Sequence, residues 1–419
     1  MIGTRRAVLL GGVPSWVLDG ATLDFDFAHG RYFGAPLSRL VCSRASVAMN
    51  VDAQGNWHQT PANMPSITNL GLWSWEQRTN SCRNSSIAGA AIGTPGTSPN
   101  LWLAAGSGVT FNVVGLGTIN GLPYIDYHVV GTTTGTFAQI AFDGVTPGSV
   151  AASGQVWNAS IFYGLTAGSF ANVTAASVNV NELDSTPTSL GNVSAVTAAF
   201  PTGPGLTRFS GGALLTASTV ASVRLLVAWS WAPGVAIDFT IRIAAPQLEL
   251  VPAATTAAQG FATPPILTSG SALTRAGDNI SVAVPSGMQS VYVVGTPTEP
   301  LSGVQNQFFA ALSDGTANNT MRLFRNTSGI VIPGMVIGGV NLQFTLTAAP
   351  SNIPTKIVGF VLPTLYQANV NGGAPGSIAV SGAFVANKLN IGEIEASNVF
   401  KINGSIQRVA LSPVSLLNQ

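Results

Sequence analysis

Apolar and polar residues alternate in short runs along most of this chain, and glycine, proline and asparagine separate the runs. The segment 21–33, ATLDFDFAHGRYF, already shows the pattern. Alternation with a period of two is typical of strands that bury one face. Similar runs recur from 87 to 252 and again from 264 to the end. The pattern predicts an all-β protein with two antiparallel β-sandwich (jelly-roll) domains.

The strand-like runs fall into two series, with a change in composition between them. Residues 21–255 are expected to form the first sandwich together with an N-terminal strand module. Residues 256–263, which are mostly small, read as a linker, and residues 264–419 are expected to form the second sandwich. Neither series shows a fixed repeat or heptads, so any oligomer has to form through sandwich faces or the N-terminal segment.

The N-terminal segment 4–20, TRRAVLLGGVPSWVLDG, begins like a twin-arginine export signal. Its apolar run is broken at Gly11 and Gly12, and no Ala-x-Ala-like cleavage site follows. A signal needs an unbroken apolar segment of roughly 7–15 residues. We therefore expect residues 1–20 to be a retained extended arm whose apolar side chains rest on a partner.

Charged residues are scarce in this chain of 419 residues, at 8% of the total. An average soluble domain has about 25%. Surface helices usually carry many Glu and Lys residues, so the composition favours strands and turns. The net charge of +1 disfavours a nucleic-acid binder, which needs clustered basic residues. No apolar run reaches the ~18 residues of a membrane span, so membrane insertion is not expected.

Motifs for enzymatic chemistry are missing from the sequence. Its three histidines are far apart, and no metal-binding, phosphate-binding or nucleophile-elbow spacing is present. Three pairs of carboxylates alternate along a run, as in sandwich-fold glycosidases. These pairs are Asp24/Asp26, Glu182/Asp184 and Glu393/Glu395. The first belongs to a structural motif, the second to a Thr/Pro/Asn-rich stretch expected to be a loop, and the third lacks an E-x-D-x-x-E signature. We therefore expect no enzyme, no cofactor and no metal.

Cys42 and Cys82 are the only cysteines. Two cysteines are too few for a disulfide framework. They are read as reduced thiols, with a single bridge between them as the alternative.

Aromatic residues offer a way to bind sugars, because a flat ring can stack on a pyranose face. Trp229 and Trp231 share one face of a strand-like run, which is either the sandwich core or an exposed platform. The candidate sugar-binding aromatics are Trp57, Tyr124, Trp157, Trp229, Trp231 and Tyr366.

Several motifs resemble a module found in structural proteins of phages and prophages. They are LDFDFAHGRYF (23–33), SRASVAMNVDAQGNW (43–57), EQRTNSCRNSS (76–86), PQLELVPAATT (246–256) and TRAGDN (274–279). The C-terminal segment from LYQANVNGG (365–373) to VALSP (409–413) is similar to the closing strands of concanavalin- and laminin-G-like jelly rolls. Trp75 and Cys82 depart from the pattern, which commonly has aliphatic residues there.

This resemblance implies a fibre, head-spike or tail protein on the surface of a virion that is assembled in the bacterial cytoplasm. Such a protein adsorbs to a host cell-surface polysaccharide and is anchored to a capsid or tail protein by its arm. The arm residues expected to anchor it are Arg5, Arg6, Leu9, Leu10 and Trp16. The expected assembly is a homo-oligomer, a trimer or, on a fivefold capsid vertex, a pentamer. The alternatives are a polysaccharide depolymerase and a structural spike without a ligand.

Overall fold

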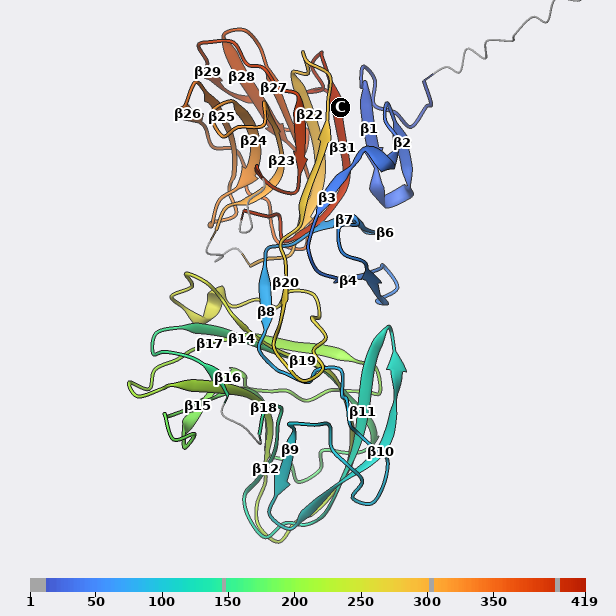
Figure 1. Ribbon diagram of the computed structural model, residues 1–419, viewed down its shortest axis with the longest axis vertical. Coiled ribbons are helices and arrows are strands. Elements are labelled where there is room, and N and C mark those ends of the chain that lie inside the picture. The colour runs from blue at the N-terminus through green and yellow to red at the C-terminus, as the bar shows by residue number, and fades with distance from the viewer. Residues whose placement is uncertain (1–12, 145–147, 301–304, 396–399) are drawn as a thin grey trace, which may run out of the picture.

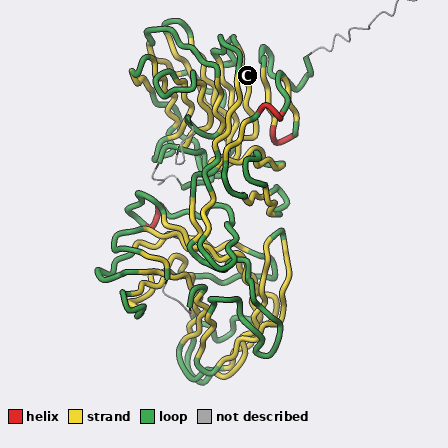
Figure 2. Tube along the Cα trace, viewed as in Figure 1, coloured by secondary structure: helices red, strands yellow, loops and turns green. Residues whose placement is uncertain are grey.

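The computed structural model describes residues 13–144, 148–300, 305–395 and 400–419, and it confirms the all-β fold class (Figure 1, Figure 2). Strands and loops make up nearly all of the described chain. Its helical segments are short 3₁₀ turns: η1 (Phe27–His29), η2 (Leu37–Arg39) and η3 (Ala257–Gln259). None of the described helices is long and apolar enough to cross a membrane.

One sandwich contains the strands drawn in warm colours in Figure 1 together with strands from the N-terminal quarter of the chain. Its first sheet has the order β2 (Arg31–Phe33), β1 (Leu23–Asp26), β31 (Gly404–Ser412), β22 (Ser290–Pro297), β27 (Thr355–Val361), β28 (Leu365–Val370), β29 (Gly376–Ala379), with β7 (Gly71–Ser74) also on β31 and β6 (Ser66–Thr68) on β7. Its second sheet has the order β26 (Val340–Gln343), β25 (Val331–Ile337), β24 (Thr320–Arg325), β23 (Gln307–Ser313), β30 (Lys388–Ile391), β21 (Asn279–Ala283), β3 (Val41–Ser43). A separate hairpin of β4 (Ala48–Val51) and β5 (Trp57–Thr60) contacts β6 of the first sheet.

The other sandwich, green and cyan in Figure 1, is formed by the middle of the chain. One sheet has the order β10 (Val109–Ile119), β11 (Leu122–Thr132), β19 (Ala236–Leu250), β14 (Val156–Gly168), β17 (Thr207–Leu214). The facing sheet has the order β16 (Ser189–Val196), β15 (Ala175–Leu183), β18 (Ser222–Ser230), β12 (Phe137–Ala141), β9 (Leu103–Gly106), with β13 (Ser149–Val150) on β18.

The N-terminal strand module does not belong to the sandwich that follows it in sequence, as the expected boundary at 21–255 implied. Strand β1 pairs with β31, where Phe25 lies opposite Val409, and β3 pairs with β21, where Cys42 lies opposite Ile280. The module thus covers one edge of each sheet of the C-terminal sandwich. An uncovered edge exposes unpaired backbone groups, so this pairing completes the fold.

The chain is therefore organised as one sandwich inserted into another. We call residues 13–80 with 273–419 the split sandwich and residues 81–272 the inserted sandwich. The chain leaves through β8 (Arg78–Asn80) and returns through β20 (Leu273–Arg275), which pair antiparallel between the two sandwiches (Figure 1). Each sandwich has its own large apolar cluster. Trp229 belongs to the cluster of the inserted sandwich, and Phe25 belongs to that of the split sandwich.

The segment expected to be a linker, 256–263, packs on the inserted sandwich instead. It contains η3, and Gly260 lies so close to β17 that a Cβ atom there would be 2.4 Å from the Cα atom of Gly212. Phe261 of the same segment is buried. Two glycines and a small-residue turn let the chain lie directly on the sheet, which explains why its composition resembles that of a linker.

Three of the sequence motifs, 43–57, 76–86 and 274–279, meet at the junction of the two sandwiches. Arg44 and Asp278 form a fully buried ion pair with 2.6 Å between Nη1 and Oδ1. The other oxygen of Asp278 accepts a hydrogen bond from the backbone N–H of Trp75 at 2.9 Å and one from Arg275 at 3.4 Å. The carboxylate thus joins the turn after β3, the outgoing chain before β8 and the returning chain after β20.

The remaining N–H groups of the Arg44 guanidinium donate hydrogen bonds to nearby residues of the N-terminal module. Its Nε donates to the carbonyl of Ser46 at 2.9 Å, and its Nη2 donates to the carbonyl of Pro61 at 2.7 Å. Nη1 also reaches the Ser66 hydroxyl at 3.1 Å. A buried guanidinium is tolerated only when its donors are paired, and here the partners are built in.

Both ends of the described chain pack on the outer face of the first sheet of the split sandwich. Val17 and Leu416 are buried there against Tyr292 and Val358. Trp16 is half-buried at the same place, and its carbonyl accepts a hydrogen bond from Arg408 at 2.6 Å. Trp16 therefore packs on the split sandwich, whereas the sequence predicted that it would contact a partner protein. The other expected anchoring residues, Arg5, Arg6, Leu9 and Leu10, lie outside the described residues.

The split organisation predicts which fragments fold. Because Asn80 and Leu273 lie opposite each other, replacing residues 81–272 by Asn-Gly should close a hairpin and leave a folded split sandwich. Residues 264–419 alone should not fold, because they lack β1, β3 and β7. Circular dichroism and urea unfolding distinguish the two fragments. Cooperative unfolding of 264–419 alone would contradict this organisation.

The buried ion pair predicts a large cost for its loss. Arg44→Ala leaves the Asp278 carboxylate buried without its main partner, and removing one member of such a pair costs about 3–5 kcal/mol. The exposed Arg39, which takes part in no ion pair within the described residues, is the control. Arg39→Ala should change the unfolding free energy by less than about 0.5 kcal/mol. Urea denaturation of the full chain measures both, and equal effects would contradict the role given to Arg44.

Candidate functional site: a polar groove on the inserted sandwich

Most of the aromatic residues expected to bind sugar lie in the cores, which corrects that expectation. A ring enclosed by protein on both faces cannot stack on a sugar. Trp229 is fully buried, and its Nε1 donates to the hydroxyl of Tyr163 at 2.9 Å. The candidates placed in cores are Trp157, Trp229, Trp231 and Tyr366. The shared face of Trp229 and Trp231 is thus core rather than platform.

Tyr124 and Trp57 are half-buried, but their rings are already in contact with protein. Tyr124 lies in β11, and the Arg242 guanidinium stands 3.8 Å from its ring centre. Asp126 holds that guanidinium through two hydrogen bonds of 2.8 Å. Trp57 packs edge-on against Phe162 with 5.8 Å between ring centres.

One carboxylate of each alternating pair is bound by neighbouring groups of the fold. Asp24 is buried and bound by Arg408, with 2.8 Å between Oδ1 and Nε. Glu182 lies in β15 rather than in a loop, and its carboxylate accepts the backbone N–H groups of Thr216 and Ala217 at 2.8 and 3.1 Å. Glu393 is buried against Lys401. Within the described ranges no three His, Cys, Asp or Glu side chains converge as metal ligands.

A groove of about 480 Å³ lies on the outer face of the inserted sandwich's β16–β15–β18–β12–β9 sheet. Its floor is low at Ala228 on the central strand β18, while longer side chains rise from the neighbouring strands. Its lining residues are Phe137, Gln139, Ser177, Asn179, Asn181, Ser189, Asn192, Ser194, Arg224, Ala228 and Ser230. Amides and hydroxyls predominate, which suits a ligand rich in hydroxyl groups.

Alternation along the strands produces this surface. In β15, Val178 and Val180 point into the core, so Asn179 and Asn181 point outward into the groove. In β18, Val223 and Leu225 point inward, so Arg224 points outward between them. The groove is therefore built on regular sheet, which holds side chains more rigidly than a loop does.

The groove ends at an exposed aromatic ring on one side. Phe137, which opens β12, is 53% exposed. It lies opposite Ser230 at the end of β18. Gln139 lies two residues further along β12, and its side-chain amide makes no hydrogen bond within the described residues. A ring beside a free amide is the combination that binds a sugar face and its hydroxyls.

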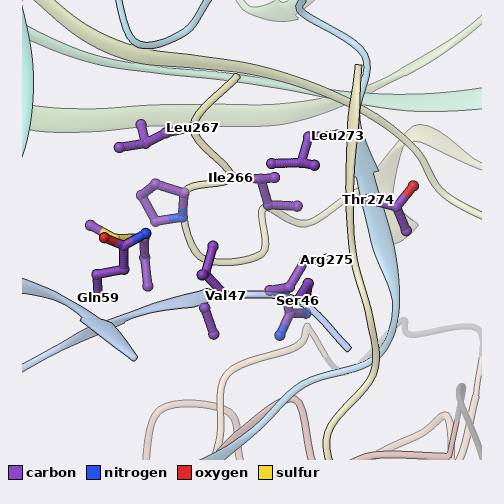
Figure 3. Close-up of a pocket in the computed structure, with 11 residues that line it drawn as sticks. Ser46, Val47, Gln59, Ile266, Leu267, Leu273, Thr274 and Arg275 are labelled. Carbon is purple, nitrogen blue, oxygen red and sulfur yellow. The ribbon is translucent and has the colours of Figure 1, made fainter. Parts of the chain in front are cut away.

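Two other hollows lie where the sandwiches meet. A cleft of about 400 Å³ is lined by Trp57, Trp73, Trp75, Phe261 and Arg208, but Trp73 and Trp75 stack on each other and are mostly buried. A second hollow, shown in Figure 3, has about 40 Å³ between Val47, Ile266 and Leu273. Ligand pockets usually have about 300–1,000 Å³, so this hollow is too small for a sugar.

The junction also holds a carboxyl group with a shifted pKa. Glu299 is buried, and burial together with the nearby charge of Glu76 raises its pKa to about 7. Its Oε2 accepts a hydrogen bond from Asn403 at 2.9 Å, and Asn403 in turn accepts one from the backbone N–H of Glu76. Glu299 therefore belongs to the polar network that links the sandwiches.

Both cysteines are free and buried, one in each sandwich, which agrees with reduced thiols rather than a bridge. Burial raises the pKa of the Cys42 thiol to about 11, and the pKa of Cys82 is raised for the same reason. Neither thiol is suited to act as a nucleophile.

The groove residues are not among the candidate site residues predicted from the sequence. The segment SVNVNEL (177–183) carried the signal, because its valines and asparagines alternate strictly. An outward face of amides marks a surface that water or a polar ligand covers. Arg224 stands out in SVRLLVAWS (222–230) as a lone charge in an apolar run.

Comparisons with known proteins give fold similarities only. No family model and no curated protein matches the sequence. The CBM40 module of the Ruminococcus gnavus IT-sialidase, solved with α2,3-sialyllactose, matches with 16% identity over 31% of this chain and 77% of its own, at a TM-score of 0.27. Domains LG4-5 of mouse laminin α1 match with 10% identity over 64% of this chain and 88% of their own, at a TM-score of 0.22. The CBM22-1–CBM22-2 tandem of Paenibacillus barcinonensis Xyn10C matches with 13% identity over 80% of this chain and 98% of its own, at a TM-score of 0.24. Similarities of this size do not indicate a function, which has to be argued from the site.

The raised pKa of Glu299 predicts that stability depends on pH. An unfolded glutamate titrates near 4.5, so the folded state holds a proton that the unfolded state has lost between about pH 5 and pH 7. The unfolding free energy should therefore fall as pH rises from about 5 to about 8, on the order of 3 kcal/mol. Glu299→Gln should flatten this dependence in urea unfolding, whereas Asp19→Asn, at an exposed site, should not. Identical slopes for wild type and Glu299→Gln would contradict the assignment.

Proposed function

We propose that this protein binds glycans through the groove of the inserted sandwich, without cleaving them. The observation that carries the proposal is the groove itself. A single exposed aromatic ring lies beside the unpaired amide of Gln139, and further amides and hydroxyls line the same rigid sheet face. These groups can stack on a sugar ring and replace the water around its hydroxyl groups. None of the residues that line the groove is a carboxylate, so the groove lacks the paired acids that glycosidases use.

The biological setting that we propose is the surface of a phage particle. Its support is the resemblance of the segments 23–33, 43–57, 76–86 and 274–279 to phage structural proteins. In this proposal the protein adsorbs the particle to a host polysaccharide, and the arm, now limited to residues before 13, docks onto a capsid or tail protein.

The proposed assembly is a homo-oligomer, with a trimer as the first expectation. A shallow polar groove binds one glycan weakly, because water competes for every hydroxyl contact. Several copies linked together raise the apparent affinity about 10²–10⁴-fold. Light scattering of the purified full chain measures the number of copies.

Glycan binding predicts a specific loss in the groove. Phe137→Ala should weaken binding to a glycan identified on an array by about tenfold, because the stacking face is lost. Ile92→Ala is the matched control, since Ile92 is an exposed apolar residue of the same sandwich outside the groove. Both variants should keep the wild-type melting temperature. Isothermal titration with the array hit measures the affinities.

The two alternative functions, a depolymerase and a structural spike, predict different results in these experiments. Release of reducing ends from the bound polysaccharide would show that the protein cleaves its glycan, and it would favour a depolymerase over a binding protein. An array without any bound glycan would leave a structural spike and overturn the proposal. Equal losses in Phe137→Ala and Ile92→Ala would place the binding site elsewhere.

A further inference from the structure

Arg224 is the one charged residue among those that line the groove, and it has no carboxylate partner among the described residues. The other ion pairs of the inserted sandwich use Arg83 with Asp143, His128 with Asp238, and Arg242 with Asp126. Glu182, which lies opposite the adjacent Val223, points to the other side of the sheet and accepts a hydrogen bond from the backbone of Thr216. Arg224 is half-buried, so water compensates only part of its charge.

The hydrogen bonds around Arg224 fix its orientation. Its Nε donates to Oδ1 of Asn181 at 3.0 Å. The amide of Asn181 can adopt only this orientation, because its Nδ2 donates to the carbonyl of Gly191 at 2.8 Å and to Oδ1 of Asn192 at 2.9 Å. The arginine is thus held through one nitrogen on a rigid strand.

The two terminal nitrogens of Arg224 are left without a partner in the described chain. Together they present a planar pair of N–H groups, the geometry that binds both oxygens of a carboxylate. Amides and hydroxyls surround this cation, and no acid competes for it within the groove. Such a site favours an anion with hydroxyl groups beside it.

We infer that the groove selects acidic glycans, with the carboxylate of a sugar acid bound by the free terminal nitrogens of Arg224. This inference rests on the proposed glycan binding and names its ligand class. Phe137 and Arg224 lie near opposite ends of the groove, because Phe137 pairs with Ser230, six residues along β18 from Arg224. At about 3.3 Å per residue this distance is roughly 20 Å, enough for several linked sugars. The ligand is therefore an oligosaccharide with an acidic unit at the Arg224 end.

The experiment compares each acidic oligosaccharide with its own carboxyl-reduced form. The probes are a uronic-acid oligosaccharide and sialyllactose, which represent the two common sources of a sugar carboxylate. Titration calorimetry with the full-length protein should show at least tenfold tighter binding of one acidic form than of its reduced form, with the difference shrinking in high salt.

Variants of the arginine test the assignment. Arg224→Gln should abolish the preference for the acidic form and leave the affinity for the reduced form unchanged, and Arg224→Lys should keep only part of it. Arg322→Gln is the matched control, because Arg322 is also half-buried and forms no ion pair in the described chain, but lies in the split sandwich. Its preference should equal that of the wild type, and melting temperatures confirm that all variants fold.

The outcomes separate this inference from the proposed function. Equal binding of acidic and reduced glycans that Phe137→Ala weakens would overturn the inference and keep glycan binding. A preference that survives Arg224→Gln would assign the carboxylate to another residue and also overturn it. Binding of neither probe, when the array gives only neutral hits, would overturn the inference as well. No binding to any glycan on the array would overturn both this inference and the proposed glycan binding.

Discussion

The buried carboxylate of Asp278 is the constraint on which the two-sandwich arrangement depends. It receives Arg44 from the N-terminal module and the backbone N–H of Trp75 from the chain that leaves for the inserted sandwich. Arg275 of the returning chain reaches it as well. A charge buried this deeply is stable only when all its partners are present. The network therefore ties the closing of the split sandwich to the correct entry and exit of the inserted one.

This arrangement separates two tasks. The split sandwich takes up the polar and ionic groups of the junction, and both described ends of the chain pack on its outer sheet. The inserted sandwich carries the groove on the outer side of one sheet, away from these groups. Its core contains the large aromatics, so the outer face can hold small and polar side chains without loss of stability.

The fold class followed from the sequence because alternation and turn residues act locally. Trp229 and Trp231 could be placed on one strand face, but the sequence left open which side that face took. The split organisation could not be predicted, because the pairing of Phe25 with the strand around Val409 joins segments that are far apart in the chain. Arg44, Asp278 and Glu76 lie within the quoted motifs, but the sequence did not indicate that these residues meet. Aromatic content proved a poor guide to the groove, since most large rings fill cores and the amides of Asn179 and Asn181 form the surface.

The inserted position of the second sandwich has a consequence for biosynthesis. Strands β1, β3 and β7 leave the ribosome first, but their partners β31 and β21 are made only after the whole insertion. At about 5–20 residues per second, the inserted sandwich is complete and able to fold while these early strands still have open edges. The nascent chain must therefore keep its first eighty residues from pairing with neighbours until the last strand, β31, arrives to close the molecule.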